Sequence, residues 1–144
     1  MSDVGPAPFA IIAGFGLPGR AVAEALAAQH IPFAVIETNP DVVHRCAALG
    51  NNIHHGDVRD RGVLHRAGVE KATLVAICVP IDRVALEAVS IVRELSPKAH
   101  IIARCAMTSM GLEAKQRGAD EIVVAEQVVA KEFARVIAAR KPNH

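Results

Sequence analysis

The chain has almost no excess of charge of either sign, because 16 basic side chains stand against 15 acidic ones. This balance argues against a nucleic-acid-binding surface or a polybasic membrane anchor, since both depend on clustered positive charge. No apolar run approaches the roughly 20 residues of a membrane span. The segment Met1 to Pro8 also lacks the basic and apolar regions of a signal peptide. The sequence therefore predicts a cytoplasmic protein that binds no nucleic acid.

Cysteine is scarce as well. Cys46, Cys78 and Cys105 are separated by 32 and 27 residues, which matches no metal-ligand or redox spacing. We interpret them as small buried hydrophobes. The adjacent histidines His54 and His55 would point to opposite faces of a strand. The sequence therefore predicts no metal site.

The length of 144 residues suits one domain with a single core and leaves no room for a separate substrate domain. Short apolar runs alternate with amphipathic stretches, which is typical of βα units around a parallel sheet. We expect a single α/β domain over 1–144, with its core at about 9–140 and a Rossmann-like, doubly wound architecture. Its six strands are predicted at 9–13, 33–36, 52–55, 73–79, 100–105 and 121–124.

Four residues mark the predicted helix ends. Asn39, followed by Pro40, is placed to cap one helix, and Asp82 is placed to cap another. Pro18 suits a first helical turn, and Gly118 suits a position just after a helix.

The most informative motif follows the first predicted strand and consists of Gly14, Phe15, Gly16, Leu17, Pro18 and Gly19. In such a GxGxxG turn, the first glycine permits the tight turn and the second lets the backbone approach a phosphate. The third glycine lets the helix pack close to the strand. The helix N-terminus presents unpaired N–H groups to an anion. A tight loop without a ligand is the alternative that the motif alone leaves open.

A carboxylate strengthens the nucleotide interpretation. The second predicted strand ends at Glu37, eighteen residues after Gly19, close to where a dinucleotide fingerprint places the group that binds a ribose diol. A carboxylate there repels a 2′-phosphate, and neither Thr38 nor the next few residues supply an arginine to offset it. The sequence therefore favours NAD(H) or an adenine nucleotide and disfavours NADP. A solvated glutamate at a strand end is the alternative.

Further site candidates lie at the ends of later strands. Asp57 and Val58 follow the third strand, where an adenine would lie, although Asp57 is equally placed to cap the next short helix. Val79 ends the fourth strand beside the point where the strand order reverses. Arg104 lies within an apolar strand, so we expect it to meet a carboxylate or, less favoured, a phosphate.

The chain resembles the TrkA-N domain, the nucleotide-binding half of the regulators of potassium conductance. The resemblance spans about Phe9 to Arg140 and is carried by GFGLPGRAVAEAL, VIETNPDVV, HGD, HIIARC and GADEIVVAE, in this order and spacing. Within that family, IPFAVIETN and GADEIVVAEQVVA are most similar to the cytoplasmic domain of potassium-efflux antiporters of the glutathione-gated type.

The resemblance implies that NAD(H) or an adenine nucleotide binds at Gly14, Gly16, Gly19, Glu37 and Asp57. It implies a regulatory domain at the inner face of the membrane that gates a cation channel or antiporter, in cis or as a separate subunit. It does not imply an enzyme.

The chain departs from the family in one position of the glycine turn. Many members carry an arginine where Leu17 stands here, so AMP, ADP or NAD(H) is favoured over ATP. The alternative function is an NAD-dependent oxidoreductase fragment, against which stands the lack of a catalytic acid or base and of a substrate domain.

An apolar stripe marks the predicted C-terminal helix. Val129, Phe133, Val136 and Ile137 recur at helical spacing, while charged residues lie elsewhere on the helix. In the family that the chain resembles, this helix reaches toward a partner subunit, which predicts a homodimer with Phe133 near the interface. The alternative is that the stripe packs on the chain's own sheet.

Overall fold

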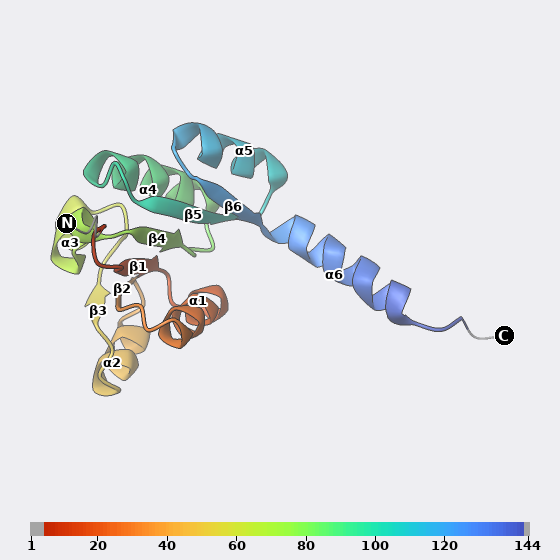
Figure 1. Cartoon of the computed structure of the whole chain (residues 1–144), viewed down its shortest axis with the longest axis horizontal. Coiled ribbons are helices and arrows are strands. Elements are labelled where there is room, and N and C mark those ends of the chain that lie inside the picture. Colours follow the sequence, from red (N-terminus) through yellow and green to blue (C-terminus); the bar gives the residue numbers. More distant parts are fainter. Residues whose placement is uncertain (1–4, 143–144) are drawn as a thin grey trace.

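A six-stranded sheet forms the centre of the computed structural model, which describes residues 5–142 (Figure 1). The strands are β1 (Ala10–Ala13), β2 (Phe33–Glu37), β3 (Ile53–His55), β4 (Leu74–Ile77), β5 (His100–Cys105) and β6 (Glu121–Val124). All neighbours pair in parallel, in the order β3-β2-β1-β4-β5-β6. The predicted fold class and the six strands are confirmed. The outermost ends of the predicted 1–144 domain lie outside the described residues.

Helices cover both faces of the sheet. They are α1 (Leu17–Ala28), α2 (Pro40–Ala48), α3 (Arg61–Ala67), α4 (Asp82–Leu95), α5 (Thr108–Arg117) and α6 (Ala125–Ala139), with a 3-10 turn η1 (Val69–Lys71). Helices α3, α4 and α5 pack on one face over Ile11, Ile77 and Ile101. Helices α1 and α2 pack on the other face over Ile12 and Val35. Within the described part of the chain, no helix combines the length and the apolar character that crossing a membrane requires.

Three of the four predicted helix ends are confirmed, including Pro18 in the first turn of α1, and one is wrong. Asn39 caps α2 by accepting the Asp41 N–H at 2.9 Å, and Gly118 follows α5 with a φ of 123°. Asp82 is instead the first residue of α4, and Ile81 precedes it as the cap residue. The Asp82 carboxylate accepts the Ala106 N–H at 2.7 Å, because the loop after β5 brings that group within reach. It therefore ties together the loops that leave β4 and β5.

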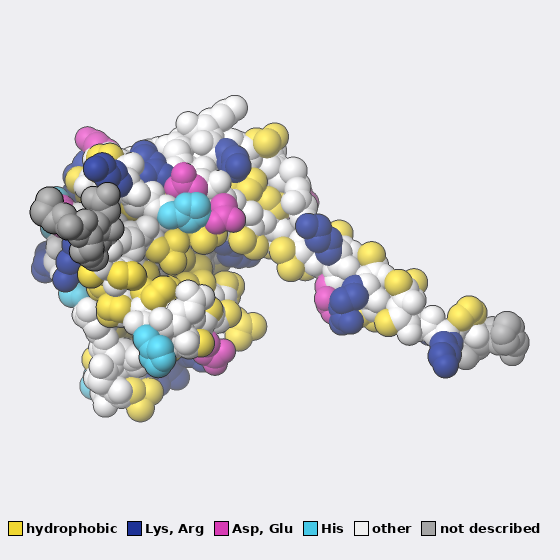
Figure 2. Space-filling view, in the orientation of Figure 1, with side chains coloured by type: hydrophobic (Ala, Val, Ile, Leu, Met, Phe, Trp, Pro, Cys, Tyr) yellow, Lys and Arg dark blue, Asp and Glu magenta, His cyan; other side chains and the backbone are white. Residues whose placement is uncertain are grey.

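One half of a sheet face is left without a helix. Helix α6 extends away from the body (Figure 1), and none of its residues is buried. An apolar groove of about 660 Å³ remains between α1, the start of α6 and the exposed face of β4, β5 and β6. Figure 2 shows hydrophobic side chains along the projecting helix and where it joins the body. The alternative that the α6 stripe packs on the chain's own sheet is therefore wrong.

Arg93 fastens the C-terminal part of α4 to the segments that enter β5 and β6. Its guanidinium donates hydrogen bonds to the carbonyl oxygens of Ala99 (2.8 Å) and Gly118 (2.7 Å) and to the Asp120 carboxylate (2.7 Å). The Arg93 side chain is only 26% exposed. This arrangement fixes the strand that carries Arg104.

We expect Arg93→Ala to lower the free energy of unfolding by about 2–3 kcal/mol, because several shielded acceptors lose a charged donor. Arg83→Ala is the matched control on the same helix, since the Arg83 side chain is 86% exposed and, among residues 5–142, pairs only within α4. Its expected cost is below about 0.5 kcal/mol. Urea denaturation of both variants measures the difference, and equal losses would contradict the role given to Arg93.

Candidate functional site

A cavity of about 440 Å³ opens at the carboxyl ends of the central strands, where the strand order reverses between β1 and β4. Ligands of doubly wound sheets bind at this point, and the volume is in the range of small-molecule sites. Nine of the residues predicted for the site line the cavity: Gly14, Phe15, Gly16, Pro18, Glu37, Thr38, Val58, Val79 and Arg104. They come from the glycine turn and from the segments after β2, β3 and β4, with Arg104 on β5.

The three glycines of the turn have different surroundings. Gly14 has a φ of +91°, and a Cβ atom there would lie 3.1 Å from the Cys78 carbonyl. At Gly19, which lies outside the cavity lining, a Cβ atom would lie 1.9 Å from the Gly14 carbonyl oxygen. A Cβ atom at Gly16 would meet nothing within 4 Å. The first and third glycines are therefore needed by the turn itself, whereas Gly16 leaves the backbone open to the cavity.

The N-terminus of α1 faces this opening. Gly16 is the residue before the helix and, lacking a side chain, does not cap the first turn. Backbone N–H groups at such a terminus lack partners within the helix and carry the positive end of its dipole. They are therefore suited to an anion.

Glu37 holds the turn against the end of β2. One carboxylate oxygen accepts the Phe15 N–H at 2.8 Å, and the other accepts the Asn39 N–H at 2.8 Å. The Thr38 hydroxyl lies 3.5 Å from the second oxygen. These contacts place the negative charge of Glu37 at the edge of the cavity, beside the glycine turn.

Asp57 does not line the cavity. Its carboxylate accepts hydrogen bonds from the Arg59 guanidinium, the closer at 2.8 Å, and these hold the pKa of Asp57 below its usual range. Arg59 also pairs with Glu87 on α4 at 3.0 Å. The interpretation of Asp57 as a helix cap is wrong, because the Asp60 side chain caps α3. Its role as an adenine neighbour stays a prediction.

Arg104 differs from the favoured expectation. Within residues 5–142, no carboxylate lies within ion-pair distance of it, and its guanidinium donates to the Pro80 carbonyl at 3.3 Å. The predicted structural ion pair is therefore wrong for the described part of the chain. Because Arg104 lines the cavity, its charge is available to a ligand there.

Leu17 points elsewhere. Its side chain is 83% exposed and lines the apolar groove rather than the cavity. Successive helical residues project about 100° apart, so neighbours in the first turn of α1 face different sides. Position 17, where many family members carry an arginine, therefore has its side chain toward the groove in this chain.

Seven further residues line the cavity but were not predicted from the sequence as site residues: Arg20, Ile36, Asn39, Val42, Gly56, Cys78 and Pro80. Burial raises the pKa of the Cys78 thiol to about 11, so it is protonated at neutral pH and is a poor nucleophile. The helical phase of α1 is the signal that could have identified Arg20. Cys46 and Cys105 are buried, as predicted for small hydrophobes, whereas Cys78 is only partly buried because it borders the cavity.

The chain is similar in sequence to a known domain family and to parts of cation transporters. The profile of the TrkA-N domain matches residues 10–125. The chain is 29% identical over 122 residues to the putative cation/proton antiporter YbaL of Escherichia coli, covering 85% of this chain and 22% of that protein. It is 27% identical over 113 residues to the glutathione-regulated potassium-efflux system protein KefC of Klebsiella pneumoniae, covering 78% and 18%. The chain thus spans less than a quarter of these relatives.

Solved structures share the fold. The TrkA-N domain of the inner membrane protein YbaL from Escherichia coli superposes with a TM-score of 0.86, at 27% identity over 93% of this chain and 99% of that one. The GsuK channel bound to NAD gives 0.82 at 21% identity, over 95% and 24%. The Kef C-terminal domain of Shewanella denitrificans in an AMP-bound form gives 0.78 at 23% identity, over 92% and 82%.

Proposed function

The chain belongs to the TrkA-N family, and from this premise we propose that it is a regulatory domain that binds an adenine nucleotide and gates a monovalent cation transporter. The observation that carries the proposal is the cavity at the strand-order reversal, where the open backbone at Gly16 and the uncapped start of α1 meet the Glu37 carboxylate. This arrangement offers one anion-binding end and one hydroxyl-binding end, as a nucleotide requires.

The proposed ligand lies with its phosphate at the glycine turn and its ribose at Glu37. Ribose hydroxyls would donate to the carboxylate oxygens that accept the Phe15 and Asn39 N–H groups. The adenine would pack near Val58, which lies in the cavity wall and is only 3% exposed. Asp57, paired with Arg59, would hold the backbone of that wall rather than donate to or accept from the adenine.

The structures of GsuK with NAD and with ADP and of the Kef domain with AMP support NAD(H), AMP or ADP as the ligand. We propose that NADP binds less tightly, because its 2′-phosphate would lie beside the Glu37 carboxylate. ATP is also disfavoured, since the side chain of Leu17 supplies no cation to distal phosphates.

We propose binding without catalysis. The ionisable side chains among the described lining residues are Arg20, Glu37, Cys78 and Arg104. Both oxygens of Glu37 accept backbone hydrogen bonds, and the Cys78 thiol is protonated at neutral pH. None of them is arranged as the acid or base that a dehydrogenase needs to manage a substrate proton.

The proposed partners are a membrane-embedded channel or antiporter, in cis or as a separate subunit, and a second copy of this chain. YbaL and KefC, named as an antiporter and an efflux system, support the first. We propose accordingly that the domain lies at the cytoplasmic face of the membrane. The exposed stripe of α6 and the neighbouring apolar groove support the second.

Calorimetry with AMP, ADP, ATP, NAD, NADH and NADP tests the proposal. We expect binding of AMP, ADP and NAD(H), with NADP weaker than NAD by about tenfold or more, as for a repulsive charge contact near 1.4 kcal/mol. Mass spectrometry of ligand that copurifies with the protein identifies the occupant, and a dye-coupled redox assay is expected to give no turnover. No binding by any nucleotide would overturn the proposal, and tightest binding by NADP would remove the role of Glu37.

A further inference from the structure

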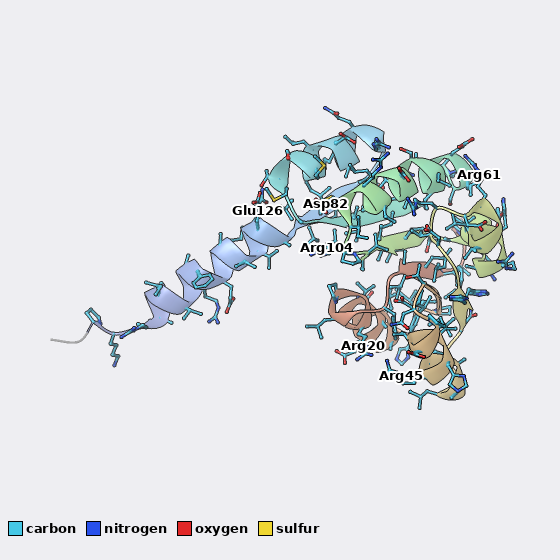
Figure 3. The ribbon with its side chains drawn as sticks, turned by 180° about the vertical axis from the view of Figure 1, so that it is seen from behind. Arg20, Arg45, Arg61, Asp82, Arg104 and Glu126 are labelled. Carbon is cyan, nitrogen blue, oxygen red and sulfur yellow. The ribbon has the colours of Figure 1, made fainter. Side chains whose placement is uncertain are left out.

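Arg20 lies outside the glycine motif but reaches the cavity. Its backbone N–H donates to the Gly16 carbonyl at 3.0 Å, so it closes the first turn of α1. Helix side chains tilt toward the helix N-terminus, and this tilt brings the Arg20 guanidinium over that turn. Arg20 accordingly lines the cavity together with Gly16 and Pro18. In Figure 3 it lies on the side of α1 that faces away from Arg104.

The Arg20 guanidinium lies over the aromatic ring of Phe15. Its central carbon lies 6.0 Å from the ring centroid of Phe15, a cation–π distance. The Phe15 ring is itself 9% exposed and belongs to the cluster of apolar side chains beneath α1 and α2. The position of Arg20 is therefore supported by a buried side chain, although Arg20 itself is exposed to solvent.

Arg20 forms no ion pair with the described residues. Six other arginines pair with carboxylates, whereas none within residues 5–142 lies within ion-pair distance of Arg20. Glu37, the acidic residue of the cavity lining, is engaged by two backbone N–H groups. With Arg104, the described lining carries two cations and one carboxylate, a balance that favours an anionic ligand.

We propose that Arg20 binds the 5′-phosphate of the nucleotide. This inference rests on the proposed function and assigns a specificity residue within it. The guanidinium offers several N–H donors in a planar fork that matches phosphate oxygens, beside the backbone N–H groups of the same helical turn. Arg20 thereby favours nucleotides that carry a 5′-phosphate over nucleosides.

Titrations of wild type and Arg20→Gln with AMP and with adenosine, followed by calorimetry and by amide NMR shifts, test the role of Arg20. We expect AMP affinity to fall about tenfold in the variant, the effect of one charge-assisted hydrogen bond. Adenosine affinity is expected to stay within about twofold, since no phosphate is lost. Arg20→Lys, which keeps the charge without the fork, should lose less AMP affinity than Arg20→Gln.

Arg45→Gln is the matched control, because Arg45 is an exposed arginine on α2 outside the cavity lining. It should leave both affinities unchanged. Equal AMP affinity in wild type and Arg20→Gln would overturn the assignment of Arg20 while leaving the proposed function intact. Equal losses for AMP and adenosine would also overturn it, since they would indicate stacking on the base. A wild-type protein that binds neither AMP nor any other nucleotide would instead overturn the proposed function.

Discussion

Replacing Gly16 with asparagine is expected to reduce nucleotide affinity by at least about a hundredfold, or 2.7 kcal/mol, while the protein stays folded. A Cβ atom at Gly16 would meet no atom of the described residues within 4 Å, so we expect a side chain there to fill space that the turn leaves open to a phosphate. Asparagine is chosen because Gly16 is the cap residue of α1 and asparagine is a favourable cap. Thermal unfolding of the free protein should therefore change little.

Gly19→Ala, in contrast, is expected to lower the stability of the folded protein. Its Cβ atom would lie 1.9 Å from the Gly14 carbonyl oxygen, a separation that requires α1 to move away from β1. Overpacking of this kind typically costs about 1–3 kcal/mol or more. Calorimetry and urea denaturation of the two variants separate a loss of binding from a loss of stability. A Gly16→Asn protein that binds AMP as tightly as wild type would place the phosphate elsewhere.

The glycine turn and Glu37 could be predicted because their positions follow from local rules. A parallel strand that ends in GxGxxG fixes where the turn faces, and the next strand places its last residue beside it. The register Ala13 with Ile36 is the pairing that brings Glu37 to the Phe15 N–H. Sequence order and strand adjacency thus suffice for this part of the site.

The roles of Asp57 and Asp82 could not be predicted in the same way. Each carboxylate precedes or begins a helix, which is the usual signal for a cap, yet each finds a partner that is supplied by tertiary structure or by its own loop. Asp82 accepts an N–H group from a segment 24 residues away, and Asp57 is held by Arg59, which also reaches α4. A carboxylate binds the donor that the fold brings closest, and the sequence pattern does not specify that donor.

Leu17 and Arg20 depend on the phase of one helix. Their side chains project only about 60° apart around α1, yet Leu17 lines the groove and Arg20 lines the cavity, because the boundary between the two surfaces falls between them. The position of a residue within the glycine motif therefore does not by itself specify whether its side chain faces the cavity or the groove. The partner of the apolar stripe on α6 could not be predicted for a related reason. An amphipathic pattern predicts that the apolar face of a helix is covered, but it does not specify which surface covers it.

Helix α6 has the physical properties of an element that requires a partner. A 15-residue helix without tertiary packing is marginal in water, and α6 buries none of its residues. Phe133 is 69% exposed and Ile137 is 64% exposed on its apolar stripe. The groove beside α6 is apolar and uncovered along β4, β5 and β6. Seating the stripe of one copy in the groove of another would cover both surfaces at once, which is the basis for the proposed homodimer.

Phe133→Asp is expected to convert the proposed homodimer to a monomer. A buried aromatic anchor of an interface typically contributes about 2 kcal/mol or more, so the dissociation constant should rise about thirtyfold at least. Lys131→Asp is the matched control, because it introduces the same side chain at an exposed charged position two residues earlier on α6. Sedimentation velocity at tens of micromolar protein measures both, with circular dichroism to confirm folding. A wild type that is monomeric at that concentration, or a folded Phe133→Asp protein that remains fully dimeric, would rule out this interface.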